Sequence, residues 1–400
     1  MMKRLALALF MTFAVLSVSA APARIKVVKK ARENPTISFN GSGADPQLAT
    51  EVNNFLSVCG WFDMGQPGKA EYSLSLRGGG GTVVADLAVG GAPVASWRFT
   101  HAGNPRATAK LIVDTLIERS FRELKVRSFC TSRIAFCAET APGIRNIYLC
   151  DIDGRGVEQL TRFRGLCVEP CWSPSGRSVF YSKYGHAGIE VLETTVGPKV
   201  MTRIVSGFRG INTGAAVSPD GRRMAVILSF DHKVDLYVME IGTRRLARLT
   251  KGIAVEASPC WSPDGRRLAY VSDESGSPRI YTIGIDGRGK TRLPTIGADA
   301  VTPDWSSDGK IVFASRLNGS YTLAVFDLKS GKATRITEAP GNWESPAWAA
   351  DNRQVVCKRT HLGRSGLFVV DTFTGRVREL LSTGYPLSMP AWSPCAPRRN

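Results

Sequence analysis

Few residues in this sequence have the types that catalysis or metal binding requires, and their spacing fits neither. Segment 363–367, GRSGL, ends in Leu367 where the hydrolase nucleophile motif G-x-S-x-G has its final glycine. The four histidines lie far apart and include no i, i+4 pair of the kind that holds zinc on a helix. They are His101, His186, His232 and His361. We therefore expect no catalytic residue and no metal site.

One acidic segment has the spacing of a calcium loop. Segment 151–156 reads DIDGRG, but segments 284–289 and 327–332, GIDGRG and DLKSGK, occupy the same place between two predicted strands. Hairpin-turn chemistry explains all three, because Asp and Gly suit the central positions of tight turns. The run GGGG at 78–81 precedes no helix, so it predicts no phosphate site. We expect no cofactor.

A sequence motif that consists of an aromatic residue followed by a Ser-Pro-Asp-Gly turn recurs along most of the chain. Its copies begin at Trp172, Val217, Trp261, Trp305, Trp348 and Trp392, in steps of 43–45 residues. In the copy at 261–266, Pro263 and Asp264 suit the centre of a β-turn, and Gly265 accepts a positive φ. Such a regular period indicates a repeat architecture.

Each repeat predicts four short strands, which is the make-up of a β-propeller blade. Segment 133–161 supplies the second, third and fourth strands of a blade that has no first strand, and 389–394 supplies a first strand with nothing after it. Joining these ends makes one blade, and five complete repeats lie between them. We therefore expect an all-β six-bladed β-propeller over 133–400, closed by pairing of its C-terminal strand.

The first part of the chain does not repeat. Residues 1–23 have the basic start, apolar stretch and small-residue end of a secretory signal peptide. Residues 24–125 predict the element order β-α-β-β-β-α, a small α+β domain, and 126–132 predict a linker. No later apolar run reaches the length of a membrane helix, so we expect no integral membrane segment after signal cleavage.

The chain is basic and rich in cysteine. Its net charge of +18 falls to +16 when Lys3 and Arg4 leave with the signal peptide, which favours acidic partners or an anionic surface. Nine cysteines are an odd number for an exported protein. Cys171 and Cys260 share the repeat position before the tryptophan and are interpreted as small core residues. Cys137 and Cys150, on adjacent predicted strands, are the closest candidate pair for a disulfide.

The sequence combines a signal peptide, a short α+β domain, the bridge into SRIAF (132–136), blades built on WSPDG and a terminal PAWSP (390–394). In this combination of features it resembles the TolB family. The likeness covers nearly the whole chain. It implies a non-enzymatic periplasmic scaffold of the Tol-Pal system, which supports outer-membrane integrity and constriction at cell division. The implied partners are a Pal-like outer-membrane lipoprotein and a TolA-like inner-membrane protein, met as a monomer within a complex, and no nucleic acid.

Two partner-binding segments follow from this resemblance and from blade geometry. Loops that enter the first strands should surround one mouth of the propeller, and we expect a Pal-like partner to meet Glu169, Asn212, Thr213, Glu256, Asp299 and Glu344 there. The acidic side chains among them should form an acidic rim on an otherwise basic protein. The mature N-terminus should meet the TolA-like partner through Arg24, Ile25, Lys26, Val27 and Val28, whose alternation suits addition to a sheet edge.

Three departures from the family pattern leave an alternative open. The N-terminal domain is short, the segment GINTGAAV (210–217) lacks the His and Pro expected in the Pal-contacting loop, and the cysteine content is unusual. The alternative is an exported propeller that binds an unrelated glycan or peptide.

Overall fold

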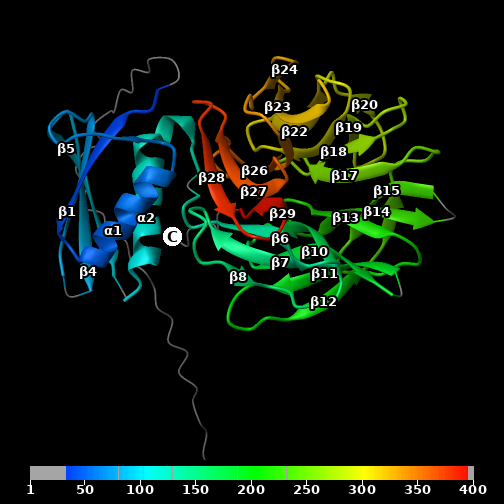
Figure 1. The fold of residues 1–400 in the computed structure, drawn as a ribbon, viewed down its shortest axis with the longest axis horizontal. Coiled ribbons are helices and arrows are strands. Elements are labelled where there is room, and N and C mark those ends of the chain that lie inside the picture. The colour runs from blue at the N-terminus through cyan, green and yellow to red at the C-terminus, as the bar shows by residue number, and fades with distance from the viewer. Residues whose placement is uncertain are drawn as a thin grey trace, which may run out of the picture. The chain divides into compact units, whose positions relative to one another are not determined.

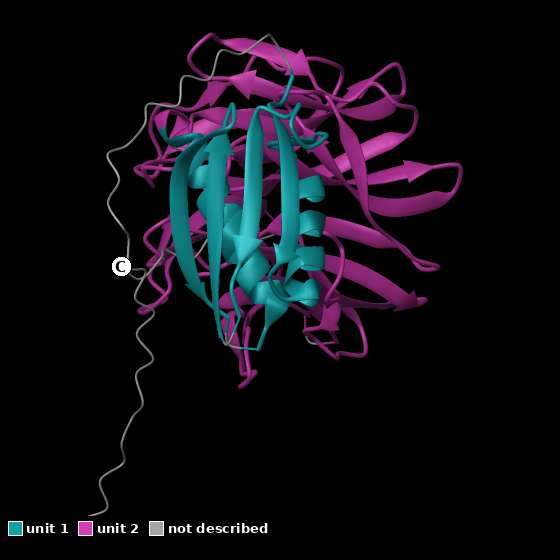
Figure 2. Cartoon of the chain, turned by 90° about the vertical axis from the view of Figure 1, so that its left-hand side faces the viewer, with its two compact units in different colours: residues 1–122 teal, residues 123–400 magenta. Residues whose placement is uncertain are grey.

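A computed structural model describes residues 33–79, 81–101, 103–127, 129–186, 188–230 and 233–394. The expected signal peptide, 1–23, and the expected TolA-contacting segment, 24–28, lie outside these residues. The chain divides after Arg122 into two compact units, which Figure 2 shows in different colours. Among the described residues, neither helix combines the length and apolar character needed to cross a bilayer.

The N-terminal unit is a five-stranded sheet with two helices on one face (Figure 1). Along the chain its elements are β1 (Thr36–Gly43), α1 (Pro46–Val58), β2 (Asp63–Met64), β3 (Tyr72–Arg77), β4 (Thr82–Val89), β5 (Ala92–Thr100) and α2 (Pro105–Ser120). The short 3₁₀ helix η1 (Arg122–Leu124) spans the division between the units. The α+β class is confirmed, and β2 is an addition because its two residues are too few to show a period.

Both helices begin at a capping side chain. The side chain of Asp45 accepts a hydrogen bond from the Leu48 amide at 2.9 Å, and that of Asn104 accepts one from Ala107 at 3.0 Å. A proline follows each cap at the first helical position, where its missing N–H costs nothing.

The second unit consists of six four-stranded antiparallel blades. Blade 1 contains β29 (Leu387–Trp392), β6 (Arg133–Ala141), β7 (Ile144–Asp151) and β8 (Glu158–Gln159). Blade 2 contains β9 (Leu166–Trp172), β10 (Ser178–Gly185), β11 (Gly188–Thr195) and β12 (Thr202–Ser206). Blade 3 contains β13 (Asn212–Val217), β14 (Arg223–Phe230), β15 (Lys233–Glu240) and β16 (Leu246–Arg248). A parallel bridge between Arg145 and Leu166 joins the sheets of blades 1 and 2.

The remaining three blades repeat the same order. Blade 4 contains β17 (Glu256–Trp261), β18 (Arg267–Ser272), β19 (Arg279–Gly284) and β20 (Thr291–Arg292). Blade 5 contains β21 (Ala300–Trp305), β22 (Lys310–Leu317), β23 (Ser320–Asp327) and β24 (Lys332–Arg335). Blade 6 contains β25 (Asn342–Trp348), β26 (Gln354–His361), β27 (Arg364–Asp371) and β28 (Val377–Ser382). The predicted six-bladed propeller is confirmed.

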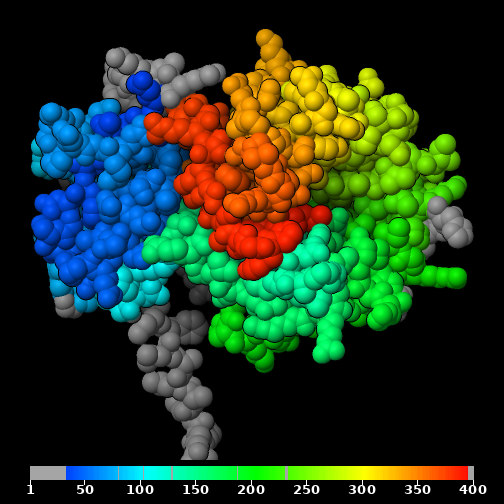
Figure 3. Space-filling view, in the orientation of Figure 1, coloured from blue at the N-terminus to red at the C-terminus, as the bar shows by residue number. Residues whose placement is uncertain are grey.

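Closure of the ring by the C-terminal strand is also confirmed. Strand β29 pairs antiparallel with β6, and Trp392 lies opposite Ile134. The Trp392 indole donates to Ser132 Oγ at 2.7 Å and packs edge-on against Phe129. In Figure 3 the C-terminal residues, in red, lie between the last blade in orange and the first propeller strands in teal.

Three of the repeated tryptophans join adjacent blades. The indole nitrogens of Trp172, Trp261 and Trp348 donate to the backbone carbonyls of Ala391, Ala216 and Asp304, at 2.8–3.1 Å. Each acceptor lies in the first strand of the preceding blade, one residue before that blade's own copy of the aromatic position. The repeated motif therefore supplies a contact between neighbouring blades as well as a turn within each blade.

Antiparallel order gives the propeller two distinct faces. The entry face carries the loops from each fourth strand to the next first strand, together with the hairpins between second and third strands. The turn face carries the turns between first and second strands and the hairpins between third and fourth strands. On the turn face, Ser262 Oγ donates to Asp264 at 2.6 Å, and Gly265 has a φ of +65°, as predicted.

None of the eight cysteines within the described residues takes part in a disulfide. Cys137 lies opposite Ile147, and Cys150 lies opposite Ile134, so the candidate disulfide does not form. Burial raises the pKa of Cys137 and of Cys150 to about 12. Both thiols are therefore protonated core groups.

Candidate partner-binding site on the entry face

Every first strand of the propeller contains a β-bulge three residues before the aromatic position. The register of each shifts there, and the bulged residue has a φ between +48° and +62°. These residues are Glu169, Gly214, Ser258, Thr302, Ser345 and Met389. A bulge bends a strand and redirects the side chains beside it. The sequence offers no residue-type signal for it, because glycine occupies only one of the six positions.

Glu169 connects two blades. Its Oε2 accepts hydrogen bonds from Thr213 Oγ1 at 2.6 Å, from Ser182 Oγ at 2.9 Å and from the Gly214 amide at 2.9 Å. Ser182 belongs to blade 2, whereas Thr213 and Gly214 belong to blade 3. Glu169 and Thr213, both predicted as partner contacts, are thus hydrogen-bonded to each other. Their role in partner binding stays a prediction, but their role between blades is visible in the structure.

Asn212 is fully buried and holds the loop that precedes it. Its Oδ1 accepts from Ser206 Oγ at 2.7 Å and from the Phe208 amide at 2.9 Å, and its Nδ2 donates to the Phe208 carbonyl at 2.6 Å. The expectation that this side chain faces a partner needs correction, because it has no accessible surface. Asn212 shapes the entry loop instead.

Glu256 occupies the same repeat position in blade 4 and is also buried. Its Oε2 has no hydrogen-bond partner. Burial raises the pKa of its carboxyl from the ordinary 4.5 to about 7, opposed chiefly by a hydrogen bond to Ser272. The other charged groups that influence it are Lys290, Glu274 and Asp235. This side chain is therefore not part of an acidic rim.

We expect Glu256 to make stability depend on pH. A folded pKa above the unfolded value means that the folded state holds the proton more tightly, so the stabilisation present at pH 4 is lost as the pH rises toward 7. Replacing Glu256 with Gln should remove this loss, and the variant should gain melting temperature relative to wild type between pH 5 and pH 8. Parallel melting curves across this range would show that Glu256 is ionised in the folded protein.

The two remaining predicted contacts are accessible, but each faces a basic side chain. Asp299 lies 3.6 Å from Arg316 Nη1, and Glu344 accepts from Lys358 Nζ at 2.9 Å. Because these pairs neutralise the carboxylates, the entry face does not carry the acidic rim that the sequence indicated. Of the six predicted mouth residues, Glu344 has the clearest access, with a third of its side chain exposed.

Exposed apolar side chains on the entry face were missed by sequence reasoning. Ile253 is 100% exposed and Val255 is 51% exposed, both in the loop from β16 to β17. Leu362, 87% exposed, lies in the hairpin between β26 and β27, and Tyr184 lies at the end of β10. Such side chains supply the buried centre of protein interfaces. The available signal was the pair of β-branched residues in KGIAVE (251–256), a loop that turn chemistry alone would make polar.

The described residues contain no group of three or more His, Cys, Asp or Glu side chains placed to hold a metal ion. Ser365 of the GRSGL segment lies in β27, an antiparallel strand, whereas a nucleophile elbow requires a strand-to-helix turn. Its hydroxyl accepts from the Leu387 amide at 3.2 Å. Ser365 thus helps to hold the closing strand.

Comparisons with known proteins agree with the fold. The chain is 35% identical over 134 residues to a Tol-Pal system protein TolB from Francisella tularensis, which covers 31% of this chain and 30% of that protein. The chain thus matches less than a third of the length of these curated relatives. Its structure resembles TolB from Acinetobacter baumannii, with a TM-score of 0.81, 19% identity, and coverage of 92% of this chain and 99% of the other.

A second solved structure, a putative TolB from Agrobacterium tumefaciens, has a TM-score of 0.53 at 21% identity and covers 64% of this chain and 89% of its own. These two likenesses show a shared fold. The decisive match is that of the family model named TolB beta propeller domain, which covers residues 124–396, the whole ring of blades and its closing strand. The chain therefore belongs to the TolB beta propeller family.

Proposed function

We propose that this protein is a non-enzymatic scaffold of the Tol-Pal system in the periplasm, where it supports outer-membrane integrity and constriction at division. The proposal has the propeller bind a Pal-like lipoprotein and the mature N-terminus bind a TolA-like protein. The observation that carries it is the entry face of a TolB-family propeller, which presents exposed apolar side chains beside accessible polar ones.

The chemistry of the entry face suits a folded protein domain. Ile253, Val255 and Leu362 can be buried against a partner, and the ion pairs Asp299–Arg316 and Glu344–Lys358 suit the polar rim of such a contact. A standard interface of this kind buries roughly 1,200–2,000 Å². Rim pairs contribute mainly to association rate, so the apolar side chains should carry most of the binding energy.

We expect replacement of Ile253 with Asp to weaken capture of the Pal-like domain at least about tenfold, because it places a charge at the centre of the contact. The melting temperature should not change, since Ile253 is 100% exposed. Met201, 58% exposed in the loop between β11 and β12 on the turn face, provides the control. Met201→Asp should bind like wild type in calorimetric titration. Equal loss in both variants, or loss in neither, would contradict the assignment of the entry face.

Removal of residues 21–28 tests the other end of the scaffold within the same titrations. This truncation should leave capture of the Pal-like domain intact and abolish binding of the TolA-like domain. If neither domain binds the wild-type protein, the exported propeller that binds an unrelated glycan or peptide becomes the better account.

A further inference from the structure

Four arginines on the turn face of blades 3 and 4 have unengaged guanidinium groups. Arg222 and Arg266 follow the glycine of the β13–β14 and β17–β18 turns, and Arg245 and Arg288 lie in the β15–β16 and β19–β20 hairpins. All four side chains are exposed. Within the described part of the chain, none of the four guanidinium groups forms a hydrogen bond or an ion pair, and the hydrogen bonds of these residues are made by their backbones.

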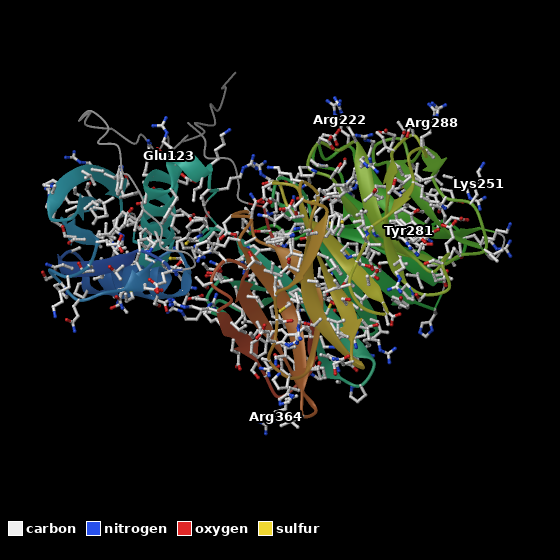
Figure 4. All side chains as sticks on the ribbon, turned by 90° about the horizontal axis from the view of Figure 1, so that it is seen from above. Glu123, Arg222, Lys251, Tyr281, Arg288 and Arg364 are labelled. Carbon is white, nitrogen blue, oxygen red and sulfur yellow. The ribbon has the colours of Figure 1, made fainter. Side chains whose placement is uncertain are left out.

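The segments that carry these arginines form one continuous surface. Arg223 of the first turn donates to the Gly265 carbonyl of the second at 3.3 Å. Arg267 of the second turn donates to the Gly289 carbonyl beside the β19–β20 hairpin at 3.2 Å. In Figure 4, Arg222 and Arg288 project from the same side of the propeller, and Arg364, in an entry-face hairpin, projects from the opposite side.

Three of the four carboxylates in these segments are held against their own turns, and the fourth, Glu240, is exposed at the end of β15. Asp220, Asp264 and Asp286 accept hydrogen bonds at 3.0–3.1 Å from the backbone amides of Arg222, Arg266 and Arg288. This is the usual use of Asp in a tight turn, and it keeps the acidic group close to the backbone. The longer arginine side chains extend past it, so the outermost groups of the surface are cationic.

The apolar side chain of Ile204, 45% exposed, lies at the edge of this surface, where its carbonyl accepts from Arg244 at 3.1 Å, but the four segments that carry the arginines have no such side chain. None of the exposed large hydrophobic side chains among the described residues falls within 218–223, 240–245, 262–267 or 284–289. A protein partner needs an apolar centre, because charged groups alone contribute little to a stable interface. A phospholipid headgroup layer does not need it, since basic side chains near an anionic bilayer are attracted without burial, and guanidinium binds phosphate through paired N–H donors.

We propose that the turn face of blades 3 and 4 docks on an anionic phospholipid bilayer, with Arg222, Arg245, Arg266 and Arg288 contacting lipid phosphates. The net charge of the chain, which is +16 without Lys3 and Arg4 of the predicted signal peptide, supplies long-range attraction to such a surface. This face is opposite the one assigned to the Pal-like domain, so the protein can bind a membrane and a partner domain at once. The inference does not depend on the identity of that partner.

The test is sedimentation with vesicles, using the chain from Arg24 onward so that the predicted signal peptide does not insert. We expect binding to phosphatidylcholine vesicles that contain phosphatidylglycerol, weak binding to phosphatidylcholine alone, and release as salt is raised. Changing Arg222, Arg245, Arg266 and Arg288 together to Gln should lower the partition coefficient at least about tenfold with no change in melting temperature.

The matched control changes four exposed basic residues of the entry face to Gln, namely Arg164, Arg209, Lys251 and Arg364. We expect this variant to partition like wild type. Three results would overturn the proposal: no sedimentation of wild type with phosphatidylglycerol vesicles, equal loss in both variants, or capture of a polyglutamate peptide as strong as that of vesicles and equally dependent on the four arginines. The last result would point to an acidic protein partner.

Discussion

Deletion of Leu387–Asn400 is expected to give a protein that aggregates or melts far below the wild type. The deleted segment contains β29, the first strand of blade 1, and its loss leaves β6 without its partner. It also removes the Ala391 carbonyl that accepts from the Trp172 indole, so blade 2 loses one of its contacts with blade 1. The unpaired edge of β6 then becomes available for pairing between molecules.

A single substitution tests the same closure in a protein that still folds. Trp392→Ala should lower the free energy of unfolding by about 3–5 kcal/mol, the usual cost of truncating a buried large aromatic side chain. Trp305, at the same repeat position in blade 5, is only partly buried, and its indole forms no hydrogen bond within the described residues. Trp305→Ala should therefore lower the free energy of unfolding clearly less. Urea denaturation of both variants, with size-exclusion chromatography of the deletion, measures this. A monomeric deletion with wild-type melting would rule out closure by β29.

Replacement of Arg353 with Met is expected to lower the free energy of unfolding by about 3–5 kcal/mol, because it leaves a buried carboxylate without its counter-charge. The Arg353 guanidinium makes two bonds to the Asp371 carboxylate, at 2.9 Å and 2.5 Å, and both side chains are 8% exposed. Arg353 also lies 4.9 Å from the centre of the Phe373 ring.

The repeat provides a matched control for this substitution. Lys310 occupies the same turn position in blade 5 and pairs with Asp308, but both of these side chains are 35% exposed. Lys310→Met should therefore cost no more than about 1 kcal/mol. Urea denaturation of the two variants compares a buried and an exposed ion pair at one repeat position. Similar costs would mean that the Arg353–Asp371 pair is not desolvated in solution.

The architecture could be predicted from the sequence because the same turn motif recurs in successive blades. The Ser-Pro-Asp-Gly turn and the aromatic residue before it can each be recognised in a single copy. Their regular period indicates that each blade packs on the next. Strand β2 was not readable, since two residues cannot display alternation. The bulges were not readable either, because residues as different as Glu169, Thr302 and Met389 adopt the same left-handed backbone.

The candidate site was harder to predict than the fold, because its residues do not share one repeat position. Glu169 and Glu256 were expected together on an acidic rim, but the bulge directs Glu169 to blade 3, and Glu256 lies two residues before its own bulge and is buried. Charge in the sequence could not distinguish these cases from Glu344, which is accessible. Exposure of Ile253 depends on the path of its loop, and periodicity does not describe loops.

The most direct test of the central claim is a calorimetric titration of the wild-type chain, from Arg24 onward, with the isolated periplasmic domain of a Pal-like lipoprotein from the same organism. The scaffold account predicts saturable binding with one domain per propeller, abolished or strongly weakened by Ile253→Asp and unchanged by Met201→Asp. Absence of any binding at high micromolar concentration, with both proteins folded, would contradict it.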